Sequence, residues 1–171
     1  MKSSGIGFAL FDSPLGEVTV VSRENRLVSL DITKEGAAVA RKRLLDRHPG
    51  AVETAKPFGN LGRLLERFFR GEEVDFDVPF DLGQLGGFTR RVLLEVKTIP
   101  FGSVRSYREI GRRLGYPMAA RAVGQAVGKN PIPIVIPCHR VIKSDGKLGG
   151  FSMGLSLKER LLALEGIRVR E

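Results

Sequence analysis

The chain has 171 residues, of which 42% are hydrophobic and 27% charged, and its formal net charge at pH 7 is +9. This composition is typical of a folded protein and excludes a largely disordered chain. No window approaches the roughly 18 consecutive apolar residues of a membrane span, and the first residues lack the apolar stretch of a signal peptide. The single cysteine, Cys138, excludes an internal disulfide. We therefore expect one or two domains in the reducing cytoplasm, without a membrane partner.

Charge divides the chain into two unlike halves. Residues 1–86 carry 12 Lys and Arg against 13 Asp and Glu, whereas residues 87–171 carry 16 against 6, so the balances are −1 and +10. A basic half joined to a neutral one is the electrostatic pattern of a nucleic-acid-binding domain. The alternative is the charged surface of a thermophilic protein, and the scarcity of Asn and Gln, five in all, fits a thermophilic source.

The first half predicts a small α/β domain. Apolar runs separated by short turn sequences indicate strands over residues 6–12, 17–22 and 26–32. Consecutive strands with such short connections form an antiparallel meander. The sequence therefore predicts an antiparallel sheet.

Helices are expected to cover this sheet. Residues 37–48 place Val39, Leu44 and Leu45 at helical spacing, and residues 61–70 form a second helix. Residues 75–79 predict a short strand, and the glycines that follow indicate a linker. We place the boundary near residue 85, which gives domains 1–85 and 86–171. The apolar face of the second helix consists of Leu61, Leu64, Leu65, Phe68 and Phe69.

Beyond the boundary the pattern is helical with short loops. Residues 89–98 present an apolar stripe, and Pro100 follows closely to end the helix. Ser106 and Glu109 have the spacing of a capping box, so a second helix begins there and ends at Gly115. A helix of about two turns is short enough to be the first helix of a helix-turn-helix.

The next helical segment, residues 117–128, consists mostly of small side chains with one arginine, Arg121. Ala119, Ala120 and Gly124 would let the backbone come close to whatever it faces. A helix that reads the major groove usually carries long polar side chains, so this surface indicates backbone-level contact with the minor groove. Tight packing between helices is an equally good explanation of these residues alone.

Cys138 is the candidate nucleophile. It ends the apolar run of residues 132–136, which we expect to be extended and stiffened by Pro133 and Pro137. A thiol with an ordinary pKa of about 8.5 needs a base or a cation nearby to react as thiolate, and His139 and Arg140 offer both. A lone cysteine is most often a buried small hydrophobe. The assignment of Cys138 as a nucleophile therefore depends on its neighbours His139 and Arg140.

His139 is not expected to contact the thiol directly, because successive side chains of an extended segment point to opposite sides. A bridging water would connect them, and a carboxylate would hold the imidazole from its other nitrogen. Glu165 is the candidate carboxylate. It ends a final helix that we expect to begin at a capping box, Ser156 to Glu159, and to stop at Gly166.

These segments resemble one family over about residues 87 to 166. The string PIPIVIPCHRV, preceded by SYREIGRRLG and AARAVGQAVGKN and followed by GGFSMGLSLKERLLALEG, is similar to the O6-alkylguanine-DNA alkyltransferases. The resemblance implies a ribonuclease-H-like α/β domain followed by a helical domain of winged-helix type. It also implies direct-reversal repair, in which an alkyl group passes from guanine O6 in DNA to the protein's own cysteine in a single turnover, without a cofactor.

The same resemblance assigns roles to individual residues. Cys138 is the acceptor, His139 and Glu165 form a water-linked relay, and Asn130 braces the turn beside the site. Arg121 fills the space left by the flipped nucleotide, and Tyr107 contacts the rotated phosphate and the base and is the candidate proton donor. The expected DNA contacts also include Arg108, Ala119, Ala120, Gly124 and Ser144, and the expected guanine pocket includes Val141, Phe151, Ser152 and Met153.

Two features depart from what is common in the family. Some members bind a structural zinc, but Cys138, His139 and His48 are too few for a usual four-ligand site, so we predict no metal. Met153 stands where many members have glycine, and it is expected to crowd the pocket against benzyl-sized adducts. The expected partner is double-stranded DNA with O6-alkylguanine, O4-alkylthymine being a second candidate lesion, and the protein is expected to be a monomer.

Three other classes compete with this interpretation. A non-enzymatic alkyltransferase-like protein would bind the same lesions, but such relatives lack the acceptor cysteine. A helix-turn-helix regulator explains the charge and the pattern of residues 106–128 but not the Cys-His-Arg sequence. A Cys-His protease needs an oxyanion hole and has no need of a basic face.

Overall fold

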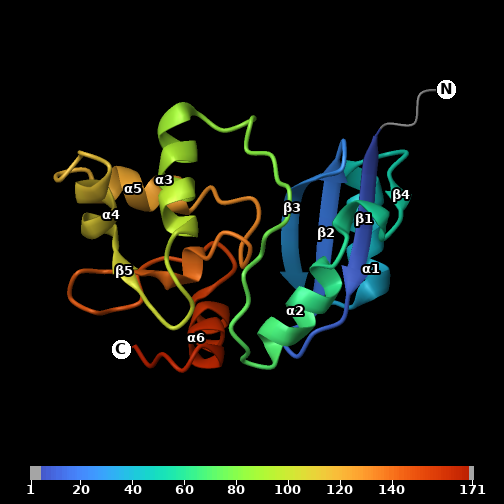
Figure 1. Ribbon diagram of the computed structural model, residues 1–171. Helices are drawn as coiled ribbons and strands as arrows, with labels where there is room; N and C mark the ends of the chain where they lie inside the picture. The colour runs from blue at the N-terminus through green and yellow to red at the C-terminus, as the bar shows by residue number, and fades with distance from the viewer. Residues whose placement is uncertain (1–4, 170–171) are drawn as a thin grey trace. The chain divides into compact units, whose positions relative to one another are not determined.

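The computed structural model describes residues 5–169, which form two compact units (Figure 1). The first unit runs to Arg70 and includes Val74–Leu82, and the second holds Gly71–Glu73 and the chain from Gly83 onward. No helix among the described residues has the length and apolar character needed to span a membrane.

The first unit is built on a four-stranded sheet. The antiparallel meander is confirmed: β1 (Ile6–Phe11) pairs with β2 (Glu17–Arg23), and β2 pairs with β3 (Arg26–Thr33). A fourth strand, β4 (Val52–Glu53), pairs with β1 in parallel and gives the order β3-β2-β1-β4. The prediction of a purely antiparallel sheet is wrong at this edge, because a strand of two exposed residues leaves no periodic pattern in the sequence.

Helices α1 (Ala37–Arg47) and α2 (Leu61–Phe69) cover opposite faces of this sheet, and a short 3-10 helix, η1 (Lys56–Phe58), precedes α2. Leu44 of α1 packs on Phe8 and Val21, which are paired across β1 and β2. Gly62 of α2 lies against the ring of Phe11, which points to the other face because side chains alternate along a strand.

The α2 apolar face is buried as predicted, with Leu61, Leu64, Leu65, Phe68 and Phe69 all in the core. In α1 only Ala40 and Leu44 are buried, whereas Val39 and Leu45 are each 39% exposed. The predicted strand at residues 75–79 is wrong. This segment is a loop that buries Val74, Phe76 and Leu82 and makes a single bridge, between Phe80 and Leu27.

The second unit packs three helices around an apolar centre. Helices α3 (Gly87–Lys97), α4 (Tyr107–Arg113) and α5 (Ala120–Val127) meet through Val92, Ile110 and Val123, which are fully buried. The predicted capping box at the start of α4 is present: the Ser106 hydroxyl accepts from the Glu109 backbone, and the Glu109 carboxylate accepts from the Ser106 backbone. Helix α5 begins at Ala120, after a turn through residues 116–119 rather than at Pro117.

The remaining elements carry the site. Strands β5 (Arg105–Ser106) and β6 (Val141–Ile142) form a short parallel pair, the 3-10 helix η2 spans Cys138–Arg140, and α6 (Leu155–Leu164) ends the unit. The predicted capping box at Ser156 is wrong. Helix α6 starts at Leu155 with Gly154 as its N-cap, in a left-handed conformation (φ 95°), so Ser156 already lies inside the first turn.

The apolar run and its prolines predicted an extended segment over residues 132–136, and this prediction is wrong. These residues form a turn in which the Ile136 amide donates to the Ile132 carbonyl at 3.0 Å and Ile134 has a φ of 73°. A β-branched residue rarely adopts this left-handed conformation, so the surrounding structure must hold the turn in place. Cys138 and His139 therefore sit on a tight helical turn and not on a strand.

Candidate active site

Cys138 lines a pocket of about 460 Å³ in the second unit. The thiol-bearing residue is only 3% exposed, and it follows directly after the turn described above. The pocket is lined by residues from α4, from α5 and from the loop before α6: Tyr107, Arg121, Gly124, Gln125, Val127, Gly128, Cys138, Gly150, Phe151 and Ser152. A nucleophile in the lining of a hollow of this kind can meet a substrate group that enters from the surface.

Burial makes this thiol a weak acid. It raises the pKa of Cys138 to about 11, against the opposing effects of a hydrogen bond from Asn130 and the positive charge of Lys158. The resting thiol is therefore protonated near neutral pH, and a base has to remove its proton before it can attack.

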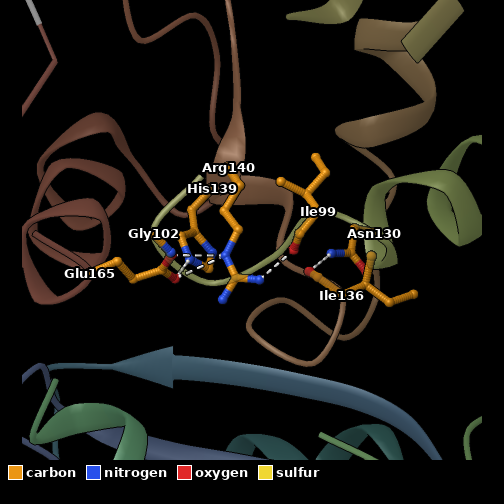
Figure 2. Close-up of polar contacts among 7 residues, drawn as sticks. All are labelled: Ile99, Gly102, Asn130, Ile136, His139, Arg140 and Glu165. Carbon is orange, nitrogen blue, oxygen red and sulfur yellow. Dashed lines mark hydrogen bonds and ion pairs between the residues drawn. The ribbon is translucent and has the colours of Figure 1, made fainter. Parts of the chain in front are cut away.

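The carboxylate of Glu165 accepts from three donors, as Figure 2 shows. His139 Nε2 lies 2.6 Å from Oε1, Arg140 Nε lies 3.0 and 2.9 Å from the two oxygens, and the Gly102 amide donates to Oε2 at 2.9 Å. Arg140 also donates through Nη1 to the Ile99 carbonyl at 2.6 Å. The carboxylate thus fixes both the imidazole and the guanidinium in place.

The protonation states in this cluster follow from burial and charge. Burial lowers the pKa of His139 below its usual value, although Glu165 opposes the shift. Burial works against ionisation of Glu165, but the hydrogen bonds from His139 and Arg140 outweigh it and hold the pKa of that carboxyl below its usual range. His139 is therefore neutral at pH 7, and because Nε2 carries the proton donated to Glu165, Nδ1 is the basic atom.

Asn130 holds the turn that presents Cys138. Its amide nitrogen donates to the Ile136 carbonyl at 2.8 Å (Figure 2). Its amide oxygen accepts from the Ile132 amide at 3.1 Å. Both partners belong to the turn around Ile134. The bracing role that the resemblance implied for Asn130 agrees with these two buried bonds.

Tyr107, the first residue of α4, forms one side of the pocket. Its hydroxyl donates to the Gly150 carbonyl at 3.4 Å, and burial raises its pKa above the ordinary value. The phenol therefore keeps its proton at neutral pH and is available as a donor.

The predicted DNA-contacting residues fall into two groups. Arg121 is exposed on α5 and lines the Cys138 pocket together with Gly124, while Ala119 and Ala120 are half-buried at the start of the helix. Arg108 and Ser144 instead line a second hollow next to Arg112 and Lys143. Of the predicted guanine-pocket residues, Phe151 and Ser152 line the first pocket, Val141 is buried in β6, and Met153 is half-buried and not part of the lining.

Two charged residues were not recognised from the sequence in the roles they have here. Arg140 was expected to act on the thiol, but it bonds to Glu165 and stacks at 5.8 Å from the Phe101 ring centroid. Lys158 was read only as part of a capping box, yet it is fully buried and donates to three backbone carbonyls. A lysine in an amphipathic helix normally lies in solvent, so the sequence carries no signal of this burial.

Comparison with known proteins matches both units to one family. Residues 6–82 match the family model described as "6-O-methylguanine DNA methyltransferase, ribonuclease-like domain", and residues 87–167 match "6-O-methylguanine DNA methyltransferase, DNA binding domain". The predicted fold class, an α/β domain followed by a helical DNA-binding domain, is thereby confirmed.

Individual relatives agree. The methylated-DNA–protein-cysteine methyltransferase of Mycolicibacterium paratuberculosis is 42% identical over 94% of this chain and 92% of its own length. The protein of the same name from Sulfolobus acidocaldarius is 38% identical over 96% of each chain. The crystal structure of Mycobacterium tuberculosis OGT in complex with DNA superposes with a TM-score of 0.79 at 37% identity, covering 93% of this chain and 92% of that one. This chain therefore belongs to the 6-O-methylguanine DNA methyltransferase family.

Proposed function

We propose that this protein repairs DNA by direct reversal, moving the alkyl group of O6-alkylguanine onto its own Cys138. Family membership supports the reaction. The observation that carries the assignment to this chain is its one cysteine, which lines a pocket and stands next to a neutral histidine that a buried carboxylate orients.

The chemistry is a displacement at carbon. His139 Nδ1 takes the thiol proton through a bridging water, the Cys138 sulfur forms a bond to the alkyl carbon, and the bond from that carbon to guanine O6 breaks. The electron pair of the broken bond stays on the guanine, which gains a proton from Tyr107, and the imidazolium returns a proton to the phenolate. The products are an S-alkylcysteine and unmodified guanine.

The reaction consumes the protein. A thioether is a poor leaving group, and the mechanism contains no group that would cleave it. We therefore propose a stoichiometric acceptor that needs neither a cofactor nor a metal, so that one molecule of protein repairs one lesion.

Access to the lesion requires base flipping, since the reacting atoms lie inside the duplex. Arg121 is proposed to enter the stack from α5, and the small residues Ala119, Ala120 and Gly124 allow that helix to approach the minor groove. Arg108 and Ser144, beside the second hollow, are proposed to hold the DNA backbone.

Several further expectations belong to the same proposal. Residues 86–171 are proposed to carry DNA binding and chemistry, and residues 1–85 to form a separate domain. O4-alkylthymine is a second substrate candidate, Met153 is proposed to disfavour benzyl-sized adducts, and the protein is proposed to act as a monomer in the cytoplasm of a thermophile. A melting temperature below about 65 °C would contradict a thermophilic origin.

The experiment that tests the proposal compares binding with repair. We expect Cys138→Ala to bind a duplex containing O6-methylguanine with an affinity within about threefold of the wild type, while losing all methyl removal. Wild-type protein that binds the lesion but leaves the methyl group in place would instead favour a non-enzymatic lesion sensor. Binding without any preference for duplex DNA would contradict both.

A further inference from the structure

We propose that Lys158 is a positioning residue of this site: its ammonium group holds the loop of residues 148–150 against β6 and Tyr107. The inference rests on the proposed alkyl transfer and deepens it. It assigns a reaction role to a residue that touches neither the substrate nor the alkyl group.

The bonding of Lys158 is unusual for a lysine. The residue is 0% exposed, and its Nζ donates to the Val141 carbonyl at 2.6 Å, to the Gly150 carbonyl at 3.1 Å and to the Leu148 carbonyl. An ammonium has three protons, so each one is used. Among residues 5–169 no carboxylate forms an ion pair with it. Since burying a charge without a counter-charge is costly, these carbonyl contacts must be good enough to retain it.

The three carbonyls belong to two segments that shape the pocket. Val141 directly follows η2, which carries Cys138, and residues 148–150 directly precede the pocket residues Phe151 and Ser152. Lys158 therefore links the segment that carries the nucleophile to the loop that leads into the pocket lining. Without the ammonium, the loop would lose its two bonds to Lys158 and β6 would lose the third.

The same loop positions Tyr107. The Gly150 carbonyl accepts from both Lys158 and the Tyr107 hydroxyl. Gly149 has a φ of 72°, and a Cβ at this position would lie 2.8 Å from the Tyr107 oxygen, so loop and ring are in close contact. A shift of the loop would displace the proposed proton donor, and small misplacements of reacting groups have large effects on rate.

Charge gives Lys158 a second effect. Its Nζ lies 6.0 Å from the Tyr107 ring centroid, and its positive charge favours the thiolate of Cys138 and disfavours protonation of His139. Burial lowers the pKa of Lys158 itself to about 8. The ammonium is thus mostly charged at pH 7 and loses its charge as the pH rises through about 8, which weakens both effects.

The test is the single-turnover rate of methyl transfer at saturating lesion duplex, measured from pH 6 to 9 together with the Kd of the duplex. For Lys158→Met we expect a limiting rate at least about tenfold lower at pH 7 with Kd within about threefold. The wild-type rate rises with pH and bends to a lower slope near pH 8, and this bend is absent in Lys158→Met. Lys158→Arg keeps the charge but not the three-carbonyl geometry, so its limiting rate should lie between those of the wild type and Lys158→Met.

Lys147→Met is the matched control, because Lys147 is an exposed lysine beside the same loop. Its limiting rate should stay within about twofold of the wild type. A rate for Lys158→Met within about twofold of the wild type at every pH, or a loss that appears only in Kd, would overturn the proposal.

Gly149→Ala covers the case in which Lys158→Met does not fold. It retains the ammonium but presses a methyl group against Tyr107, so it should lower the limiting rate about tenfold and keep the bend near pH 8. An unchanged rate in Gly149→Ala would overturn the positioning role. Failure of the wild type to transfer methyl at all is a separate result, which would contradict the proposed function instead.

Discussion

The two units of the molecule differ in where their charged side chains lie: the first pairs them at the surface, and the second also buries some of them. In the first unit the ion pairs Arg41–Glu53, Lys42–Asp46 and Glu66–Arg70 are formed by side chains that are all more than 40% exposed. In the second unit the Arg140 and Glu165 side chains are 7% and 0% exposed, and Lys158 is buried as well. Surface pairs contribute little to stability, whereas buried charges are costly and persist only where their partners are complete.

This difference in the burial of charge distinguishes a unit that is built on apolar packing from a unit that holds the reactive groups. The first unit reaches its fold by burying apolar faces on both sides of a sheet, and its charges could be exchanged with small effect. The second unit places charged and titratable groups inside its core, next to the one cysteine. Buried titratable groups with shifted pKa values mark functional sites, so the contrast alone points to the second unit as the seat of the reaction.

The largest expected effect comes from removing the carboxylate that the His139 imidazole and the Arg140 guanidinium share. Glu165→Gln leaves the buried Arg140 without its counter-charge, and we expect the free energy of unfolding to fall by about 3–5 kcal/mol. The matched control in the first unit is Glu66→Gln, which breaks an exposed pair and should cost at most about 1 kcal/mol. Urea unfolding of both variants measures the difference, and equal losses would contradict the comparison.

A smaller loss is expected at the turn before Cys138. Asn130→Ala removes two buried hydrogen bonds and leaves the Ile132 amide of the strained turn unpaired, while the Ile136 carbonyl keeps only its bond from the Cys138 amide, so the free energy of unfolding should fall by about 1–3 kcal/mol. Methyl transfer should slow as well, because the turn presents the thiol. Unfolding curves and single-turnover rates of the same preparation check both, and a stable variant with normal transfer would remove Asn130 from the site.

Arg121→Ala tests the exposed charge of the second unit. Since the side chain is exposed on α5, the free energy of unfolding should change by no more than about 0.5 kcal/mol, whereas affinity for lesion DNA should fall about tenfold. Arg23→Ala, an exposed arginine of the first unit, is the control and should leave the Kd unchanged. Fluorescence anisotropy with labelled duplex distinguishes them; equal Kd values for the two variants would contradict the assignment.

The most subtle effect is the pH dependence of stability. His139 has a lowered pKa when folded, so below its ordinary pKa near 6.5 the unfolded chain binds more protons and stability falls as the pH falls. Glu165, also lowered, adds to the same trend at more acidic pH. The decline in unfolding free energy from pH 7 to 5 should therefore be shallower in His139→Gln than in the wild type. Parallel declines would show that His139 is not the group that titrates.

Much of the fold could be predicted because local periodicity reports burial. The spacing of Leu61, Leu64, Leu65, Phe68 and Phe69 gave α2 and its buried face, and the capping box at Ser106 gave the start of α4. The pairing of His139 with Glu165 was predicted from the residues, with Glu165 as the candidate carboxylate, before the resemblance implied it as well. By contrast, β4 is too short for a pattern, and the N-cap at Gly154 makes no side-chain bond that a motif could report.

The parts of the site that were missed depend on tertiary contacts. The sequence indicated Arg140 as a cation for the thiol and Lys158 as an exposed helix residue, and only packing shows that Arg140 bonds to Glu165 and Lys158 to three carbonyls. The prolines around Ile134 indicated an extended segment, but the bonds of Asn130 fold it into a turn. The bonds of Arg140 to Glu165 and of Lys158 to the carbonyls join residues 8 to 25 positions apart, and those of Asn130 span 2 and 6 positions without following the period of a helix or strand, so no periodic pattern in the sequence records them.

The central claim is that Cys138 accepts the alkyl group once and irreversibly. The most direct measurement is the intact mass of the protein after incubation with an equimolar duplex that contains one O6-methylguanine, with Cys138→Ser alongside. We predict a gain of one methyl group in the wild type alone, about 14 Da, that reaches one equivalent and then stops. An unchanged mass while the lesion disappears, or removal of many lesions by each molecule of protein, would contradict the claim.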